Sequence, residues 1–461
     1  MKFSSTRGIV KDVSLEQTVF SGYALDGGIF LPNFIPKLTK ENLELLRNLS
    51  YVELAEEILS YYVENDQIPK EVLKGILRKS WGNFAKDNIV EMASFDNIHI
   101  MELFHGPTLA FKDLAMRILG QMMQYFLARN EKTVTVLVGT SGDTGSSAIE
   151  AVKGLSNINI IVLLPKGKCS PLQALQMTSV NEKNVLVFEV EGTSDDLDRP
   201  IKECFGDVKF VEENSLCSMN SINWIRIMVQ VVHYFYAYFK VAKNVDETVE
   251  IAVPNGAMGN ITGGFIAQQM GLPINLVACT NENDITAKCI KTGDLVVMDE
   301  IIMTPAPSMD ISFPYNIERI IYLLSNRDTK LVTKLMTEFE SKGKTTIPSC
   351  ILERMQKVFL TSTASNSNIL SCIQEVHDRY NYLICPHTAT AVCKHPQVAI
   401  ATASPAKFPE VIESIGLRAP IMETTAKLRS AKNYARSMKL GENWLEILKQ
   451  AVLELNSKKS I

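Results

Sequence analysis

The sequence lacks the features that mark several large classes of protein. No apolar run is long enough to span a membrane, and the first residues, MKFSSTRGIVKDVSLEQ, lack the apolar stretch of a signal peptide. The nine cysteines are odd in number and include no Cys-x-x-Cys pair, which argues against both a disulfide framework and a zinc ribbon. We therefore expect a cytoplasmic protein with reduced thiols and no bound metal.

An excess of charge of one sign is also missing. The formal net charge is −4, so neither nucleic acid nor an anionic membrane is an expected partner, and any anion site must be local. Hydrophobic residues make up 46% and charged residues 21% of the 461 positions, which is an ordinary globular balance. A chain of this length favours two or three packed units over a single core.

The pattern along the chain changes near residue 95. Before it, helical runs dominate, at 40–49, 51–64 and 68–79. After it, short β-rich runs alternate with helical stretches, at 97–104, 133–138, 158–164, 185–190, 249–253 and 274–279. Such alternation predicts mainly parallel sheets with helices on both faces and ligands at the carboxyl ends of the strands.

One helix is expected to place a lysine in its first turn. Apolar residues recur at paired four-residue spacing over 112–129, which predicts a helix that begins at Lys112 and Asp113. A lysine that forms a Schiff base must be neutral, and Phe104, Leu109 and the neighbouring apolar residues could desolvate it. The alternative is an ordinary solvated lysine.

Two glycine-rich segments follow strands and open helices. In GTSGDTGSS (139–147), backbone N–H groups could converge on an anion, although a tight turn with Asp143 or Thr144 as helix cap is as probable. In VPNGAMGNITGG (253–264), Gly256, Gly259 and Asn260 could hold a phosphate. Glycine-rich turns are common in α/β proteins, so this signal is weak by itself.

Two further segments carry candidate ligand-binding side chains. In NSINWIR (220–226), Asn220, Asn223 and Arg226 recur at spacing three, which predicts one helix face that could clamp an anion. A capped helix with a solvated arginine is the more ordinary alternative. The segment VAIATASPAKF (398–408) predicts a buried strand that ends at Thr402.

Together these segments resemble the threonine synthase family. The motifs, in the family's order, are LFHGPTLAFKD (103–113), GTSGDTG (139–145), NSINWxR (220–226), VPxGxxGN (253–260), PSMDI (307–311), CPHTA (385–389) and ATASPAKF (401–408). The resemblance covers the whole chain and implies an α/β enzyme of fold type II that depends on pyridoxal 5'-phosphate (PLP). It would have two mainly parallel-sheet lobes and a helical N-terminal domain. We expect the domains at 1–95, 96–240 and 241–461, with the lysine and substrate-anion motifs in the second and the cofactor-phosphate loop in the third.

The resemblance also implies a role for individual residues. Lys112 would be the Schiff-base lysine, Thr402 would bind the pyridine nitrogen, and Asp143 would lie near the phenolic oxygen. The cofactor phosphate would be cradled by Gly256, Ala257, Met258, Gly259 and Asn260. The substrate carboxylate would face Ser141 and Thr144, and the substrate phosphate would face Asn220, Ser221 and Arg226.

Two positions depart from the usual family pattern. Ala257 and Cys385 stand where threonine synthases usually have Asn and Asp. These departures, with STRG and FSGYALDGG near the start, are more similar to an animal branch of the family, which is associated with phosphate elimination without net threonine synthesis. We therefore expect a phospho-lyase that converts a small phosphorylated amino acid, O-phosphohomoserine or O-phosphothreonine, to 2-oxobutyrate, ammonia and phosphate. Threonine synthase proper and, remotely, a non-catalytic nucleotide-binding module are the alternatives, and the oligomeric state is not predicted.

Overall fold

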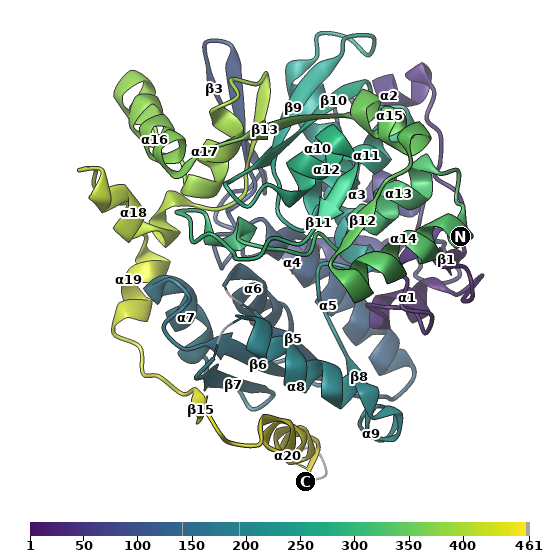
Figure 1. Ribbon diagram of the computed structural model, residues 1–461, viewed down its shortest axis with the longest axis vertical. Helices are drawn as coiled ribbons and strands as arrows, with labels where there is room; N and C mark the ends of the chain where they lie inside the picture. Colours follow the sequence, from purple (N-terminus) through teal and green to yellow (C-terminus); the bar gives the residue numbers. More distant parts are fainter. Residues whose placement is uncertain (141, 193, 458–461) are drawn as a thin grey trace.

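The computed structural model describes the backbone of residues 1–140, 142–192 and 194–457. Two open sheets organise the chain and lie one above the other in Figure 1. The strand order is β13-β10-β9-β14-β4-β3 in the larger sheet and β15-β7-β6-β5-β8 in the smaller. All neighbouring strands in these two sheets are parallel except the β3–β4 pair. The predicted α/β class with mainly parallel sheets is confirmed.

Seven strands, β4, β5, β6, β7, β9, β10 and β14, coincide with apolar runs of the sequence. The larger sheet contains β3 (Glu91–Phe95), β4 (Ile98–Glu102), β9 (Val249–Pro254), β10 (Ile274–Thr280), β13 (Phe359–Thr363) and β14 (Val398–Ala401). The smaller contains β5 (Val134–Gly139), β6 (Ile158–Pro165), β7 (Val185–Val190), β8 (Leu216–Cys217) and β15 (Arg436–Met438). Every residue of β6 is buried, because helices cover both faces of a parallel sheet. Two antiparallel pairs complete the set: β1 (Phe3–Ser5) with β2 (Phe30–Pro32), and β11 (Asp294–Val296) with β12 (Lys344–Thr346).

Two strands cross the domain boundaries expected from the sequence. β4, from the range 96–240, pairs with β14 in the larger sheet, and β15, from the range 241–461, pairs with β7 in the smaller one. The last helix, α20 (Trp444–Ser457), then packs against α8 (Ser194–Gly206) at the lower end of Figure 1. The C-terminal segment thereby covers an apolar face of the smaller sheet that would otherwise meet water.

The N-terminal region contains four helices. They are α1 (Leu15–Phe20), α2 (Lys40–Leu46), α3 (Tyr51–Ser60) and α4 (Lys70–Trp81). The first three begin with capping boxes at Ser14, Thr39 and Ser50, which satisfy N–H groups in the first turn. The helical runs predicted before residue 95 are confirmed, although the β1–β2 pair was not expected.

Two long helices pack against each other and against helices of the N-terminal region. They are α5 (Lys112–Arg129), which has the bounds expected from the sequence, and α10 (Trp224–Val241). The other helices are α6 (Asp143–Val152), α7 (Pro171–Thr178), α9 (Val208–Asn214), α11 (Gly259–Met270), α12 (Ile285–Thr292), α13 (Ile317–Leu324), α14 (Thr329–Lys342), α15 (Ser349–Val358), α16 (Asn366–Tyr380), α17 (Pro386–Val392), α18 (Pro409–Ser414) and α19 (Glu423–Arg429). Two 3-10 turns, η1 (Pro307–Met309) and η2 (Pro405–Lys407), lie in loops. Within the part of the chain that the structure describes, no helix is long and apolar enough to cross a membrane.

Candidate active site

A cavity of about 820 Å³ lies at the carboxyl ends of strands from both sheets. The loops after β5, β9 and β14 line it, together with the first turn of α5 and the segment that leads into α10. The expected site residues that line the cavity are Lys112, Asp143, Thr144, Asn220, Ser221, Arg226, Gly256, Ala257, Met258, Gly259, Asn260 and Thr402. Ser141 lies outside the described residues.

Backbone pairing holds Lys112 next to Thr402. The N–H of Phe111 donates to the carbonyl of Thr402 at 2.8 Å, and the N–H of Ser404 donates to the carbonyl of Leu109 at 3.0 Å. α5 begins at Lys112, whose side chain is 13% exposed and lines the cavity. Thr402 is buried and also lines the cavity. The lysine and the hydroxyl are thus fixed by the same short stretch of paired backbone.

The buried side chain of Asp113 holds the loop that precedes Lys112 in place. Its carboxylate accepts hydrogen bonds from the N–H and the hydroxyl of Thr108, both at 2.7 Å, and from the hydroxyl of Ser147 at 2.8 Å. A Cβ atom at Gly106 would come within 2.4 Å of this carboxylate, so the glycine of HGPT is required by close approach. The sequence assigned no role to Asp113, and the structure gives it a local one.

Asp143 lies between two lysines. One carboxylate oxygen, Oδ2, lies 3.5 Å from Nζ of Lys112, and the other, Oδ1, lies 2.7 Å from Nζ of Lys407. The side-chain amide of Gln173 also donates to Oδ1 at 2.8 Å, and the Ser308 hydroxyl lies 3.4 Å from Oδ2. Burial alone would raise the pKa of this carboxyl, but Lys407 and Lys112 hold the pKa of Asp143 well below its usual range. Asp143 is therefore a fixed negative charge beside Lys112.

The electrostatic surroundings favour a neutral amine at Lys112. Burial lowers its pKa, and the positive charges of Arg226 and Lys407 lower it further, against the opposing effect of Asp143. A lowered pKa increases the fraction of unprotonated amine at neutral pH, and this is the form that attacks a carbonyl carbon. Lys112 thus has the surroundings that a covalent cofactor lysine needs.

The first turn of α6 differs from the capped turn considered in the sequence. Neither Asp143 nor Thr144 caps the helix, because the N-cap position belongs to Gly142 and carries no side-chain cap. Instead the hydroxyl of Thr140 accepts from the N–H groups of Gly142 and Gly145, both at 3.1 Å. Asp143 and Thr144 therefore do not cap α6, and both line the cavity.

The start of α11 fits a phosphate group. The N-cap residue, Met258, has φ 60° and gives no side-chain cap, so the first N–H groups of this 12-residue helix are open to a ligand. Asn260 accepts the Tyr234 hydroxyl at 2.7 Å through Oδ1, and its buried Nδ2 has no partner among the described residues. A donor without a partner beside a helix N-terminus matches the needs of the PLP phosphate. The residues present therefore fit this cofactor.

A second cationic position faces the same cavity. Arg226 is only 4% exposed, and Nη1 donates to the carbonyl of Met219 at 3.1 Å, but it has no carboxylate partner among the described residues. Burial lowers its pKa to about 10, so it stays charged at neutral pH. Asn220 and Ser221 line the cavity in the loop before α10. These three residues could bind an anion at a position separate from the start of α11.

The prediction that Asn220, Asn223 and Arg226 share a helix face is wrong. α10 begins at Trp224, so Asn220 precedes the helix. Asn223 is the N-cap: its Oδ1 accepts the N–H of Ile225 at 2.9 Å, and its Nδ2 donates to the carbonyl of Val19 at 3.0 Å. The Asn223 side chain therefore fastens the N-terminal region and does not line the cavity.

Asn316 and Arg319, which the sequence did not single out, connect the loop before α10 with the loop before α11. The Asn316 amide donates to the carbonyl of Ala257 at 2.9 Å and lies 3.5 Å from the carbonyl of Ser221. Arg319 is fully buried and donates to Oδ1 of Asn316 and to the carbonyl of Ile222, both at 2.5 Å. These bonds fix the distance between the loops, and only the folded chain brings their partners together.

The two positions that depart from the family pattern have different surroundings. Ala257 lines the cavity, whereas Cys385 is fully buried and caps α17, with its sulfur accepting the N–H of Thr388 at 3.4 Å. His387, in the first turn of α17, does line the cavity. Its Nε2 accepts the N–H of Ser308 at 3.0 Å, and burial lowers its pKa to about 4, so the ring is neutral. An effect of Cys385 on the cavity must therefore be indirect, through this helix or through Ala403 and Phe408, with which its side chain packs.

Known proteins resemble this chain along its full length. The family model for the threonine synthase N terminus matches residues 2–81, and that for pyridoxal-phosphate-dependent enzymes matches residues 91–402. Threonine synthase-like 2 from Rattus norvegicus is 41% identical, covering 99% of this chain and 98% of its own length. Threonine synthase from Saccharomyces cerevisiae is 34% identical, over 88% and 87%. The crystal structure of PLP-bound threonine synthase from Brucella melitensis superposes with a TM-score of 0.93 at 36% identity, over 99% of both chains.

Proposed function

Because the chain belongs to the threonine synthase family of PLP-dependent enzymes, we propose that it is a phospho-lyase acting on O-phosphohomoserine or O-phosphothreonine. Either substrate plus one water would yield 2-oxobutyrate, ammonia and phosphate. The observation that carries this proposal is Arg226: a buried cation without a carboxylate partner among the described residues, in the same cavity as Lys112. A substrate phosphate would supply the missing negative charge.

We assign the cofactor site as follows. The phosphate would be held by the loop Gly256, Ala257, Met258, Gly259 and Asn260, with Nδ2 of Asn260 as a side-chain donor. Thr402 would bind the pyridine nitrogen, and Asp143 would lie near the phenolic oxygen. Bound PLP supplies an electron sink for negative charge that develops at the substrate Cα. Among the described residues that line the cavity, Asp143 is the only acidic one, and it is assigned to the phenolic oxygen. The pyridine nitrogen would therefore face the neutral Thr402 hydroxyl and not a carboxylate, which favours a ring nitrogen without a proton.

The remaining residues would bind and orient the substrate. Ser141 and Thr144 would face its carboxylate, while Asn220, Ser221 and Arg226 would bind its phosphate. Lys112, once free of the cofactor, would take the proton from Cα, because its pKa is lowered by burial and by neighbouring cations. For O-phosphohomoserine, whose phosphate is on Cγ, a second proton must leave Cβ before the phosphate departs. Arg226 would stabilise the negative charge that grows on the departing phosphate.

Elimination is favoured over threonine synthesis by the two departures. Threonine formation requires a water molecule held at Cβ until it adds. Ala257 offers only a methyl group to the cavity where the family usually has an amide, and Cys385 removes a carboxylate from the helix that carries His387. The change at Ala257 leaves fewer polar groups in the cavity to hold such a water, which supports release of the unsaturated intermediate and its hydrolysis. Cys385 is buried outside the cavity, so its change can affect that water only indirectly.

Product analysis tests this function. The purified holoenzyme is supplied with each phosphorylated amino acid, and phosphate, 2-oxobutyrate and threonine are quantified by chromatography. We expect phosphate and 2-oxobutyrate in equal amounts, with little threonine. The variant Ala257→Asn should raise the share of threonine formed from O-phosphohomoserine. Threonine as the main product of the unmodified enzyme would instead identify a threonine synthase.

A further inference from the structure

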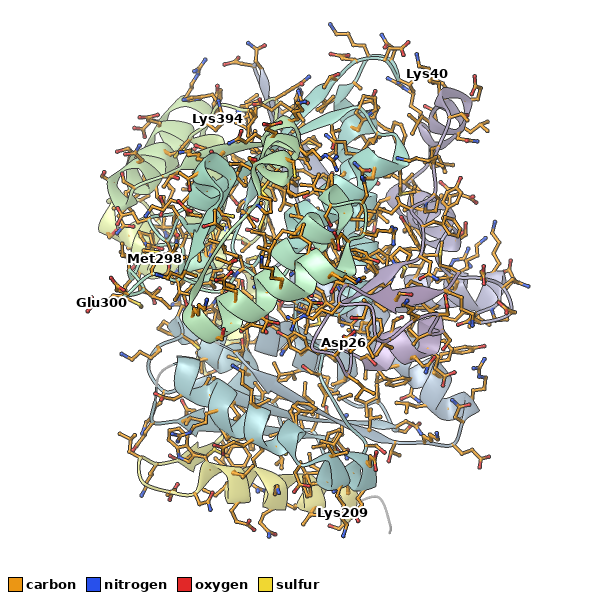
Figure 2. All side chains as sticks on the ribbon, turned by 45° about the vertical axis from the view of Figure 1, so that its right-hand side comes forward. Asp26, Lys40, Lys209, Met298, Glu300 and Lys394 are labelled. Atoms are coloured by element: carbon orange, nitrogen blue, oxygen red, sulfur yellow. The ribbon has the colours of Figure 1, made fainter. Side chains whose placement is uncertain are left out.

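Lys407 is a lysine in an unusual position. It lies in η2 and none of its side chain is exposed, whereas the side chains of Lys40 and Lys209 are 68% and 84% exposed and project from the periphery of the molecule in Figure 2. Burying a lysine is costly unless its charge is paired and all its donors are used. The complete burial of Lys407 next to the cavity therefore needs a physical explanation.

Lys407 contacts a residue that lines the cavity but does not line the cavity itself. Its Nζ lies 2.7 Å from Oδ1 of Asp143 and donates to the carbonyl of Thr108 at 2.7 Å. Lys407 does not line the cavity, whereas Lys112, on the other side of the Asp143 carboxylate, does. Lys407 can therefore reach the reacting groups only through Asp143.

The charged groups around Lys112 come from four elements besides its own. Asp143 belongs to α6, Arg226 to α10, His387 to α17 and Lys407 to η2. His387 is buried and neutral at neutral pH, so Asp143 carries the one negative charge among them, and it is shared between two lysines. Asp113, next to Lys112 in sequence, is occupied by Thr108 and Ser147.

We propose that Lys407 is a positioning residue that occupies one oxygen of Asp143 and so keeps Lys112 as a neutral amine. The inference rests on the assignment of Lys112 as the cofactor lysine. If Lys407 were absent, Asp143 would pair with Lys112 alone and stabilise its protonated form. With Lys407 present, the carboxylate is already neutralised, and Lys112 gains less from keeping its proton. Because Lys407 is enclosed and donates to two oxygens, Lys112 is the lysine that gives up its proton.

The same geometry explains which lysine reacts. Lys407 has two oxygen partners at hydrogen-bonding distance and no access to the cavity, whereas Lys112 has one carboxylate oxygen at 3.5 Å and partial exposure. An amine must be both neutral and accessible to attack a carbonyl carbon. Of the two lysines that contact the Asp143 carboxylate, Lys112 is therefore the reactive amine and Lys407 has an electrostatic role.

The test measures the pKa of Lys112 in the full-length protein after removal of the cofactor. Trace acetylation with acetic anhydride over a range of pH, followed by mass spectrometry of the Lys112 peptide, reports the neutral fraction directly. We expect Lys407→Met to raise the apparent pKa of Lys112 by about one unit or more, which is a tenfold loss of neutral amine at pH 7. Lys407→Arg should restore the original value. The rate at which added PLP restores the visible absorbance at pH 7 should fall and recover in parallel.

Two further variants separate this role from general damage. Asp143→Asn should lower the pKa of Lys112, opposite in sign to Lys407→Met, whereas loss of structure would move both variants alike. Lys449, on the distant α20, forms a 2.6 Å ion pair with Asp207, the N-cap of α9, and Lys449→Met should change nothing at Lys112. An unchanged or lower pKa in Lys407→Met would overturn the proposal. If that variant does not fold, failure of Asp143→Asn to lower the pKa overturns it instead.

This result is independent of the reaction catalysed. The labelling uses no substrate, so it stands whether the products are those of a lyase or of a synthase. If another lysine holds the cofactor, borohydride trapping identifies it while the shift at Lys112 remains measurable. Failure of the proposed function and failure of the inference are therefore distinguishable.

Discussion

Replacing Arg226 by alanine should abolish most of the preference for phosphorylated substrates. Arg226 is 4% exposed and keeps its charge at neutral pH, and among the described residues its guanidinium donates one hydrogen bond, to the carbonyl of Met219. A positioned cation in a site from which water is excluded interacts more strongly with developing charge than an exposed one. Loss of one such donor costs about two to four kcal/mol of transition-state stabilisation.

That free energy corresponds to a decrease of about 30-fold to 900-fold in kcat/KM. The assay is steady-state release of phosphate from O-phosphothreonine, with formation of 2-oxobutyrate measured in the same samples. L-threonine serves as a matched substrate without phosphate. Because Arg226 would contact only the phosphate, its removal should reduce kcat/KM for O-phosphothreonine far more than for L-threonine. Arg226→Lys should recover part of the loss, since it restores the charge but not the planar fork.

Lys202 provides a matched control for general electrostatic effects. It also lines the cavity but is exposed, so solvent screens its charge, and Lys202→Ala should change kcat/KM by less than about threefold. Equal losses for both substrates in Arg226→Ala would refute the proposed phosphate clamp. So would unchanged turnover of O-phosphothreonine, provided that thermal unfolding shows the variant to be folded.

Two other predictions follow from the buried ionisable groups. Borohydride reduction of the holoenzyme should leave a pyridoxyl group on the peptide that contains Lys112, and mass spectrometry that found it on Lys407 would contradict the assignment. His233, whose Nδ1 lies 2.8 Å from the hydroxyl of Tyr51, has its pKa lowered by burial from 6.5 to about 3. At pH values between about 3 and 6.5, His233 binds a proton in the unfolded chain but not in the folded chain. The free energy of unfolding should therefore fall as pH decreases from about 6.5. Urea titrations should show a weaker pH dependence for His233→Gln, and an identical slope in both proteins would show that another group is responsible.

Local sequence patterns were sufficient for the elements that position the site. The apolar spacing over 112–129 gave the bounds of α5, and each of the six apolar runs named from the sequence coincides with a strand. Periodicity and β-rich composition act over neighbouring residues, so they can be read without knowing the fold. The short strands β1, β2, β3, β8, β11, β12, β13 and β15 were missed, because each has two to five residues and lacks a distinct apolar run that would separate it from a loop.

The glycine-rich loops were recognisable as candidate anion sites, and the structure places both at the cavity, but the roles of other motif residues were not recognisable. Asn220 and Asn223 have the same side chain in the same motif, yet only Asn220 lines the cavity. The difference depends on where α10 begins and on contacts of Asn223 with Val19, some 200 positions away in the sequence. Spacing along one segment cannot report such contacts.

The sequence by itself determined the α/β class, the parallel strands, the helix that begins at Lys112 and, through its motifs, the family. Tertiary structure alone decided which charges meet. Asp143 and Lys407 lie on different elements, and the strength of their interaction depends on a distance of 2.7 Å and on complete burial. Electrostatic interactions depend on separation and on exposure to water, and both quantities are set by the packing of segments distant in sequence. The motif ATASPAKF therefore contained Lys407, but only the folded chain showed that its charge is directed at the carboxylate beside Lys112.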